Sequence, residues 1–139
     1  MRAALITGAS RGIGAATARL LAQRGCAVAV NYYRSEERAM ALVEELTGAG
    51  YPAMAVRADV ADAEETRRMV DNVLDKFCQL DILVCNAGVS QSGLLSDLTP
   101  AEWRRIFGVN VDGVYHTVRA ALPHLIHRKA GRIVTVSSM

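Results

Sequence analysis

A glycine-rich segment near the amino terminus is the first feature of this 139-residue sequence with an evident chemical use. Residues 7–14 read Thr-Gly-Ala-Ser-Arg-Gly-Ile-Gly, a G-x-x-x-G-x-G spacing that differs from the commoner G-x-G-x-x-G fingerprint. Glycines permit a tight turn and a close approach of the backbone to a pyrophosphate, and a following helix offers free N–H groups at its start. A plain tight turn is the structural alternative. The place of the segment between a predicted first strand and first helix favours dinucleotide binding.

The residues at and after the end of the second predicted strand could determine whether the site prefers NAD or NADP. A site that prefers NAD usually places an acid at the end of this strand, where it binds the ribose 2′-OH. Asn31 holds that position here and is followed by Tyr32, Tyr33 and Arg34. The absence of an acid removes a repulsion against a 2′-phosphate, and arginine presents a fork of donors that fits phosphate oxygens. The sequence therefore predicts NADP(H), with a solvated loop charge as the alternative interpretation of Arg34.

Two further groups of residues follow the third and fourth predicted strands. Asp59 and Val60 come after the third strand, and Asn86, Ala87 and Gly88 end the fourth. Open α/β sheets bind ligands at the carboxyl edge of their strands, so we expect both groups at one site with the glycine-rich segment. The small residues would admit a cofactor ribose, and Asn86 could hold the neighbouring loops. Asp59 could alternatively precede a helix as a cap, although Asp62 is better placed for that role.

Short apolar runs alternate with helical stripes along the chain, and these elements must position the residues above. We expect strands over residues 3–7, 27–31, 53–57, 81–85 and 132–136. Strand–helix alternation with short connections implies right-handed crossovers and a parallel sheet covered on both faces. The predicted fold class is therefore α/β, a Rossmann-type doubly wound parallel sheet in the order 3-2-1-4-5. The apolar stripe of the first helix is predicted to contain Ile13, Ala16, Leu20 and Leu21.

Capping residues mark the later helix starts. Ser35 is expected to cap the second helix, and Asp62 with Glu65 resembles a capping box before the third. The clearest start is Thr99-Pro100-Ala101-Glu102, which combines a capping box with proline at the first helical position. One long helical stretch is predicted from there, and Pro123 is expected to kink it.

Composition and charge exclude several function classes. Hydrophobic residues make up 51% of the chain and charged residues 22%, which is too apolar for a disordered coil. A formal net charge of +2 gives no broad basic field for nucleic acid, and no apolar run approaches the ~18 residues of a membrane span. Cys26, Cys78 and Cys85 lack the paired spacing of a disulfide framework or a zinc site. We expect one cytoplasmic domain over residues 1–139, with neither a metal site nor a leader segment. We expect this domain to be incomplete, because the sequence stops directly after the fifth predicted strand.

Five motifs, in this order, resemble the short-chain dehydrogenase/reductase family. They are the glycine-rich segment, Asp59-Val60, the triplet at 86–88, Asn110, and Val-Thr-Val-Ser-Ser at 134–138. The resemblance covers the whole chain and is nearest to the 3-oxoacyl-(acyl-carrier-protein) reductases. A second likeness, in residues 90–103 and 137–139, is to a relative proposed to reduce a 5-aminopentanone group on elongation factor P.

The resemblance implies a role for each of these residues. Asp59 would bind the adenine amino group with Val60 along the ring, and Arg11 would reach the 2′-phosphate from the side opposite Arg34. Ser138 would be the catalytic hydroxyl that binds the substrate oxygen, and Asn110 would interrupt a helix turn and hold a water of the proton relay. The implied cofactor site consists of Thr7, Gly8, Ser10, Arg11, Gly12, Ile13, Gly14, Arg34, Asp59, Val60, Asn86, Ala87 and Gly88.

The proton donor of this family is absent from the sequence. The family supplies it as a tyrosine in a Tyr-x-x-x-Lys helix after the serine, where the lysine lowers the phenol pKa from its ordinary ~10. No tyrosine here has lysine four residues on, and the nearest pair, Tyr115 with Arg119, stands on the wrong predicted helix. The three histidines have no motif partner and are expected to serve packing or the surface. They are His116, His124 and His127.

Three interpretations remain open at this point. In the first, the chain is the amino-terminal part of an NADPH-dependent reductase that acts on a small-molecule or carrier-bound ketone. The 139-residue form is then expected to be inactive, and the intact protein to be a homo-dimer or tetramer. Alternatively, the chain is a dinucleotide-binding or regulatory module without catalysis, or a scaffold whose exposed face binds a partner. Neither nucleic acid nor a membrane is an expected partner.

Overall fold

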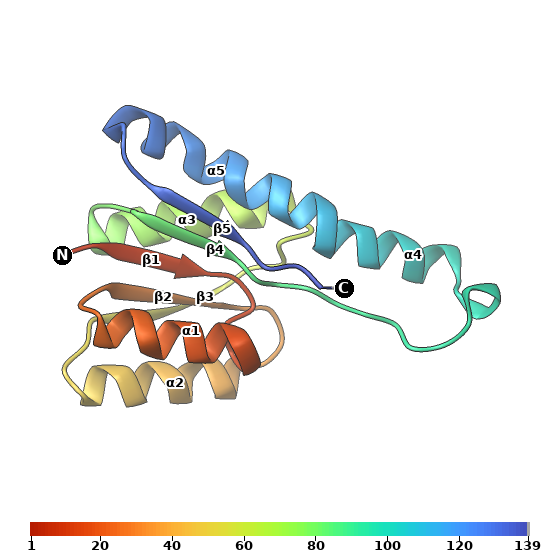
Figure 1. The fold of residues 1–139 in the computed structure, drawn as a ribbon, viewed down its shortest axis with the longest axis horizontal. Helices are drawn as coiled ribbons and strands as arrows, with labels where there is room; N and C mark the ends of the chain where they lie inside the picture. The colour runs from red at the N-terminus through yellow and green to blue at the C-terminus, as the bar shows by residue number, and fades with distance from the viewer. Residues whose placement is uncertain (139) are drawn as a thin grey trace.

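The computed structural model describes residues 1–138, and Figure 1 shows one sheet between two layers of helices. The strands run in the order β3-β2-β1-β4-β5, and all neighbours are parallel. Their bounds are β1 Ala3–Ile6, β2 Ala27–Tyr32, β3 Ala53–Arg57, β4 Ile82–Cys85 and β5 Arg132–Thr135. The predicted fold class and strand order are confirmed, and each predicted strand end is correct to within one residue.

The helices cover both faces of the sheet. Their bounds are α1 Gly12–Gln23, α2 Glu36–Gly48, α3 Ala63–Phe77, α4 Pro100–Phe107 and α5 Gly113–Arg128. Helices α1 and α2 lie on one face, and α3 and α5 lie on the other (Figure 1). Each face has its own core, the first around Ile6 and Val30 and the second around Leu5 and Leu83. Successive residues of a strand point to opposite faces, which is why Leu5 and Ile6 belong to different cores.

Helix α1 packs on the sheet through small side chains rather than through the predicted stripe. Ile13 is 66% exposed and Leu20 is 52% exposed. The residues that α1 buries are Gly14, Ala15, Ala18 and Ala22. The prediction was wrong for Ile13, Ala16 and Leu20, all of which are exposed. It followed hydrophobicity alone, whereas close approach of this helix to the sheet requires small residues.

The predicted helix starts are confirmed for α3 and α4. Thr99 accepts a hydrogen bond from the N–H of Glu102, whose carboxylate accepts in return from the N–H of Thr99, with Pro100 at the first helical position. Asp62 caps α3 through the N–H of Glu65. The predicted capping box is not completed, because the Glu65 carboxylate accepts from the N–H of Asp59 instead of that of Asp62. Ser35 stands at the N-cap position of α2 but makes no side-chain cap bond.

The long helical stretch after Thr99 is interrupted at Asn110, as the family resemblance implies, and not at Pro123, where a kink was predicted. Gly108–Asp112 forms a π-helical turn between α4 and α5, and Asn110 lies within it. Helix α5 continues through Pro123, so the break does not lie at the proline. Gly113, which follows the turn, packs so closely on the loop after β3 that a Cβ there would lie 2.7 Å from Val60 Cγ2.

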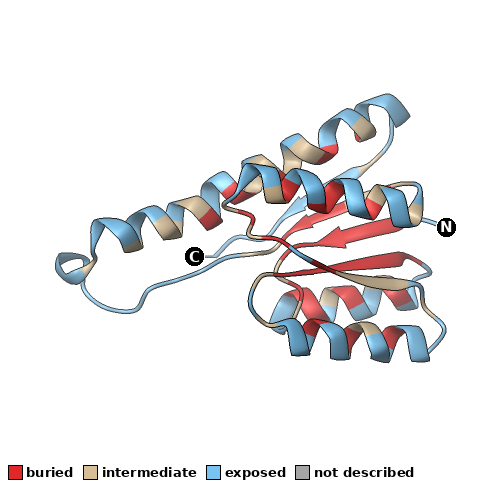
Figure 2. Ribbon diagram, turned by 180° about the vertical axis from the view of Figure 1, so that it is seen from behind, coloured by how far each residue is buried: buried red, intermediate tan, exposed pale blue. Residues whose placement is uncertain are grey.

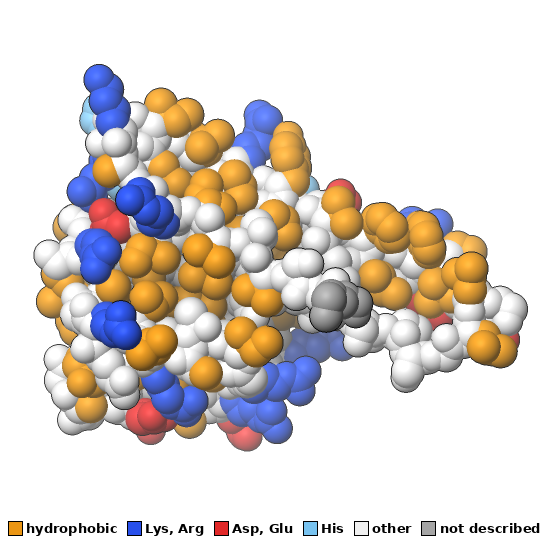
Figure 3. Space-filling model, viewed as in Figure 1, with side chains coloured by type: hydrophobic (Ala, Val, Ile, Leu, Met, Phe, Trp, Pro, Cys, Tyr) orange, Lys and Arg blue, Asp and Glu red, His pale blue; other side chains and the backbone are white. Residues whose placement is uncertain are grey.

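Strand β5 differs from the other strands because all four of its residues are exposed (Figure 2). Ile133 and Val134 of β5, with Leu122 and Ile126 of α5, are exposed apolar side chains. Figure 3 shows apolar side chains gathered on this side of the molecule. Within residues 1–138, no helix combines the length and the apolar character needed to cross a membrane.

Candidate functional site

A cavity of about 620 Å³ opens where the carboxyl ends of β1, β2 and β4 meet. This volume lies within the ~300–1,000 Å³ usual for cofactor and small-molecule sites. The predicted site residues that line it are Gly8, Ser10, Arg11, Gly12, Ile13, Arg34, Asp59, Val60, Asn86, Ala87 and Gly88. The remaining wall residues are Asn31, Tyr32, Tyr33, Ser35, Ala58, Val89, Arg105 and Val109.

The glycine-rich turn brings an uncapped helix start to this cavity. Gly8 and Gly12 have φ angles of +60° and +58°, in the left-handed region that glycine tolerates. A Cβ on Gly14 would lie 2.6 Å from both Gly8 O and Asn86 Nδ2. Arg11, the N-cap residue of α1, makes no side-chain cap bond, and the first turn of α1 has no acidic residue. The free N–H groups and the positive end of the helix dipole therefore suit a pyrophosphate.

Thr7 and Asn86 join the ends of β1 and β4 behind the cavity. The Thr7 hydroxyl accepts hydrogen bonds from the N–H groups of Asn86 and Ala87 at 2.9 and 3.0 Å. The Asn86 amide donates to the carbonyls of Thr7 and Gly8 at 3.1 and 3.0 Å. Thr7 is buried and is not a wall residue, so it acts on the site by fixing the turn.

Asn31 borders the cavity, but its side chain is committed to the backbone. The residue is 2% exposed, and its Oδ1 accepts a hydrogen bond from the N–H of Gly8 at 3.0 Å. Its Nδ2 lies 3.3 Å from each of three carbonyl oxygens, those of Tyr32, Val56 and Ala58. These bonds use the polar atoms of Asn31, so its side chain supports the backbone of the turn and of the neighbouring strand ends. The first exposed residue after β2 is Arg34.

Replacing Asn31 with aspartate should destabilise the protein rather than create an NAD-preferring site. A carboxylate cannot donate to the three carbonyls, and its charge would be buried against them. We expect Asn31→Asp to lower the free energy of unfolding by about 3 kcal/mol, measured by urea denaturation at pH 7. Asn72→Asp on the exposed side of α3 is the matched control, with an expected change below about 0.5 kcal/mol. Equal stability of the two variants would contradict this role of Asn31.

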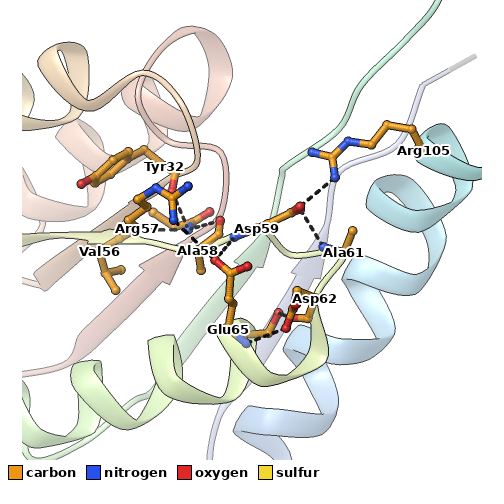
Figure 4. Close-up of polar contacts among 11 residues, drawn as sticks. Tyr32, Val56, Arg57, Ala58, Asp59, Ala61, Asp62, Glu65 and Arg105 are labelled. Atoms are coloured by element: carbon orange, nitrogen blue, oxygen red, sulfur yellow. Dashed lines mark hydrogen bonds and ion pairs between the residues drawn. The ribbon is translucent and has the colours of Figure 1, made fainter. Parts of the chain in front are cut away.

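Asp59 is held by the elements on both sides of it, as Figure 4 shows. Its Oδ2 accepts a hydrogen bond from Arg105 Nη1 at 2.8 Å, and its Oδ1 accepts one from the N–H of Ala61 at 3.1 Å. Its own N–H donates to Glu65 Oε1 at 3.3 Å. A carboxylate has about four lone-pair sites, so these bonds leave room for a further donor such as an adenine amino group. Arg105, which comes from α4, was not predicted as a site residue from the sequence.

The two residues predicted to be catalytic are not wall residues of the cavity. Asn110 Oδ1 accepts a hydrogen bond from the N–H of Val89, and its Nδ2 donates to Val89 O, both at 2.8 Å. Its side chain therefore holds the loop after β4. Ser138 follows β5 at the same carboxyl edge of the sheet, where the N–H of Val136 donates to Cys85 O at 3.0 Å. Their roles in catalysis stay predictions.

The tyrosine–arginine pair and the histidines are not wall residues of the cavity. Arg119 Nη1 donates to the Tyr115 hydroxyl at 3.0 Å, and Tyr115 is 58% exposed. His116 Nδ1 lies 3.0 Å from Val60 O in the loop after β3. His124 Nε2 accepts a backbone N–H just before β4 at 3.2 Å. These two histidines serve packing, as expected.

The cysteines give no sign of redox or metal chemistry. Cys26 and Cys85 are buried free thiols, and Cys78 is exposed. Burial raises the pKa of the Cys85 thiol to about 11, so it stays neutral at the end of β4. In the part of the chain that the structure describes, no three His, Cys, Asp or Glu side chains gather as metal ligands do.

The fold and the site together define a class of protein. An open parallel sheet with a glycine turn, an uncapped helix start and strand ends around one cavity is a dinucleotide-binding domain. Residues 2–139 match the family model described as short chain dehydrogenase. The chain belongs to this family.

Relatives and solved structures agree with this assignment. The chain is 41% identical to a 3-oxoacyl-[acyl-carrier-protein] reductase FabG of Staphylococcus aureus over 138 residues, 99% of this chain and 56% of the relative. A short chain dehydrogenase from Burkholderia cenocepacia, solved in complex with NADP, is 44% identical with a TM-score of 0.92; the match covers 99% of this chain and 55% of that one. A 3-ketoacyl-ACP reductase from Sinorhizobium meliloti is 41% identical, also with a TM-score of 0.92, over 98% of this chain and 53% of that one. The chain spans little more than half the length of these proteins.

Proposed function

We propose that the whole protein is an NADPH-dependent oxidoreductase that reduces the keto group of a 3-oxoacyl thioester, or a similar ketone, to an alcohol. The observation that carries the proposal is the cavity, where the uncapped start of α1 lies with Arg11 and Arg34. Within residues 1–138 neither arginine has an ion-pair partner. The relatives named as 3-oxoacyl reductases favour this substrate class, and the NADP-bound neighbour favours the phosphorylated cofactor.

The proposal assigns a task to each part of the site. The start of α1 and its glycines bind the pyrophosphate, Asp59 and Val60 bind the adenine, and residues 86–88 lie along the ribose. NADPH, when bound, supplies the hydride. Ser138 binds the substrate oxygen, and Asn110 holds a water of the proton relay.

The proposal extends to the whole protein. Residues 1–139 form its NADP-binding domain, and the acid of a Tyr-x-x-x-Lys segment completes the site. The enzyme acts in the cytoplasm as a homo-dimer or tetramer on a small-molecule or carrier-bound ketone. The exposed aromatic residues of α4 and α5, Trp103, Phe107 and Tyr115, favour such an assembly. Light scattering of the whole protein tests it, and a monomer would contradict it.

NADPH should bind more tightly than NADH, and the difference should depend on Arg34 and Arg11. A charge-assisted bond to phosphate contributes roughly 1.5–3 kcal/mol before screening, which corresponds to about tenfold or more in Kd. We expect Arg34→Ala to weaken NADPH about tenfold and NADH less than about twofold in fluorescence titrations. Arg24→Ala, at the exposed end of α1, is the matched control. Equal affinity for the two cofactors, or no loss in the Arg11→Ala, Arg34→Ala double variant, would contradict the assignment.

Turnover separates this proposal from the other interpretations. NADPH oxidation by the whole protein with an acetoacetyl thioester is the expected result. NADPH binding without turnover of any ketone would identify a non-catalytic module. Turnover only with elongation factor P that carries 5-aminopentanone would identify the second reductase class.

A further inference from the structure

Three guanidinium groups surround the ring of Tyr33 at the rim of the cavity. The Cζ atoms of Arg34, Arg57 and Arg105 lie 5.2, 5.1 and 5.3 Å from the ring centroid. The three arginines come from the loop after β2, the end of β3 and helix α4. Because each is close to the same ring, no two of their Cζ atoms are more than about 10 Å apart, which is near the Debye length at physiological salt.

The positive charge of this cluster is only partly neutralised. Arg105 pairs with Asp59 at 2.8 Å, whereas Arg57 lies at a longer 3.6 Å from Glu65 Oε1. Arg34 has no ion-pair partner within residues 1–138. Three arginines therefore share two carboxylates, and both carboxylates also accept backbone N–H groups. The cluster keeps a net positive charge that an external anion can balance.

The cluster faces the cavity from two directions. Tyr33, Arg34 and Arg105 are wall residues of the cavity, whereas Arg57 is not. Arg34 belongs to the loop after β2 and Arg105 to α4, and both guanidinium groups lie close to the Tyr33 ring. An anion at this ring can receive donors from both guanidinium groups at once. The aromatic face itself attracts cations, which lowers the cost of bringing the arginines together.

We propose that Arg105 is a further specificity-determining residue, which binds the 2′-phosphate of the cofactor jointly with Arg34. This inference rests on the proposed NADP(H) site. A guanidinium has five N–H donors, so Arg105 can hold Asp59 with one and still offer others to a phosphate. Arg105 would then contact both Asp59, the carboxylate proposed to bind adenine, and the 2′-phosphate that distinguishes NADP from NAD. Arg57 adds charge next to the same ring without lining the cavity.

Titration of the 139-residue chain with 2′,5′-ADP and with 5′-AMP tests the proposal, because the two nucleotides differ only in the 2′-phosphate. The wild-type chain should bind 2′,5′-ADP more tightly. Arg105→Gln should weaken 2′,5′-ADP about tenfold and 5′-AMP less than about threefold, since it removes a charge-assisted bond to phosphate. Arg105→Lys retains the charge and should keep most of the preference. Arg104→Gln, the exposed neighbour on α4, is the matched control and should behave as wild type.

Two results would overturn the role of Arg105. An equal loss for both nucleotides in Arg105→Gln would show that it acts only through Asp59, and an unchanged preference would show that it does not contact the phosphate. Thermal unfolding of each variant identifies any loss caused by misfolding. A wild-type chain that does not distinguish the two nucleotides would refute the proposed NADP(H) site itself, so the two failures are separable.

Discussion

Ketone reduction by the 139-residue chain should be at least about 10²-fold slower than reduction by a longer form that carries a Tyr-x-x-x-Lys segment after Ser138. A positioned general acid contributes about 10²–10⁴ in rate, and no tyrosine of this chain has lysine at that spacing. Tyr115 cannot replace it, because its hydroxyl is bound by Arg119 on the exposed side of α5 and the residue does not line the cavity.

The measurement is NADPH oxidation with an acetoacetyl thioester, made on both forms at equal concentration. NADPH titration of the same samples is the control, since the short chain should still bind the cofactor. Clear turnover by the short chain that disappears in Ser138→Ala would mean that a residue within this sequence supplies the proton.

Alanine at Gly14 or Gly8 should abolish saturable NADPH binding and lower the free energy of unfolding by about 3–5 kcal/mol. A Cβ at Gly14 would lie 2.6 Å from Gly8 O, and one at Gly8 would lie 2.8 Å from Ala87 Cα. The second change also forces alanine into a backbone conformation with φ of +60°. The obstacles are backbone atoms, so the turn itself must move, and the start of α1 moves with it.

Two other glycines are controls for this effect. Gly48 ends α2 with no atom within 4 Å of a Cβ, so Gly48→Ala should be neutral or stabilising by up to about 1 kcal/mol. Gly12 also has open space but a φ of +58°, so Gly12→Ala should cost only about 1–2 kcal/mol. Urea denaturation and NADPH fluorescence titration measure both quantities. A Gly14→Ala variant as stable as Gly48→Ala would contradict the steric argument.

The fold could be predicted from the sequence because its signals are local. Each strand is a short apolar run between turn residues, and the capping residues Asp62 and Thr99 mark helix starts within four residues of chain. The side of α1 that faces the sheet could not be predicted from hydrophobicity. It depends on the distance between helix and sheet, which favours Ala15 and Ala18 over Ile13.

The site could be predicted only where its residues stand at strand ends. The glycine turn and the triplet at 86–88 meet that condition, and the cavity gathers them. Arg105 does not, because it is 46 residues from its partner Asp59 and stands on a helix whose periodicity marks only apolar positions. The structural role of Asn31 could have been predicted from its place in the sequence. A polar side chain within a strand buried on both faces must find hydrogen-bond partners in the protein, which leaves none of its donors for a ligand.

The divergence of β1 and β4 has a consequence for how this fold opens a crevice. The two strands pair up to Ile6 and Val84, and β1 then leads toward β2 while β4 leads toward β5, so the sheet has its topological switch point here. Where two neighbouring strands separate, their backbone N–H and C=O groups normally lose their hydrogen-bond partners. Thr7 and Asn86 satisfy these groups with a hydroxyl and an amide. These two side chains therefore join the strand ends that border the cavity, and we expect substitutions there to change the cavity while the paired part of the sheet stays intact.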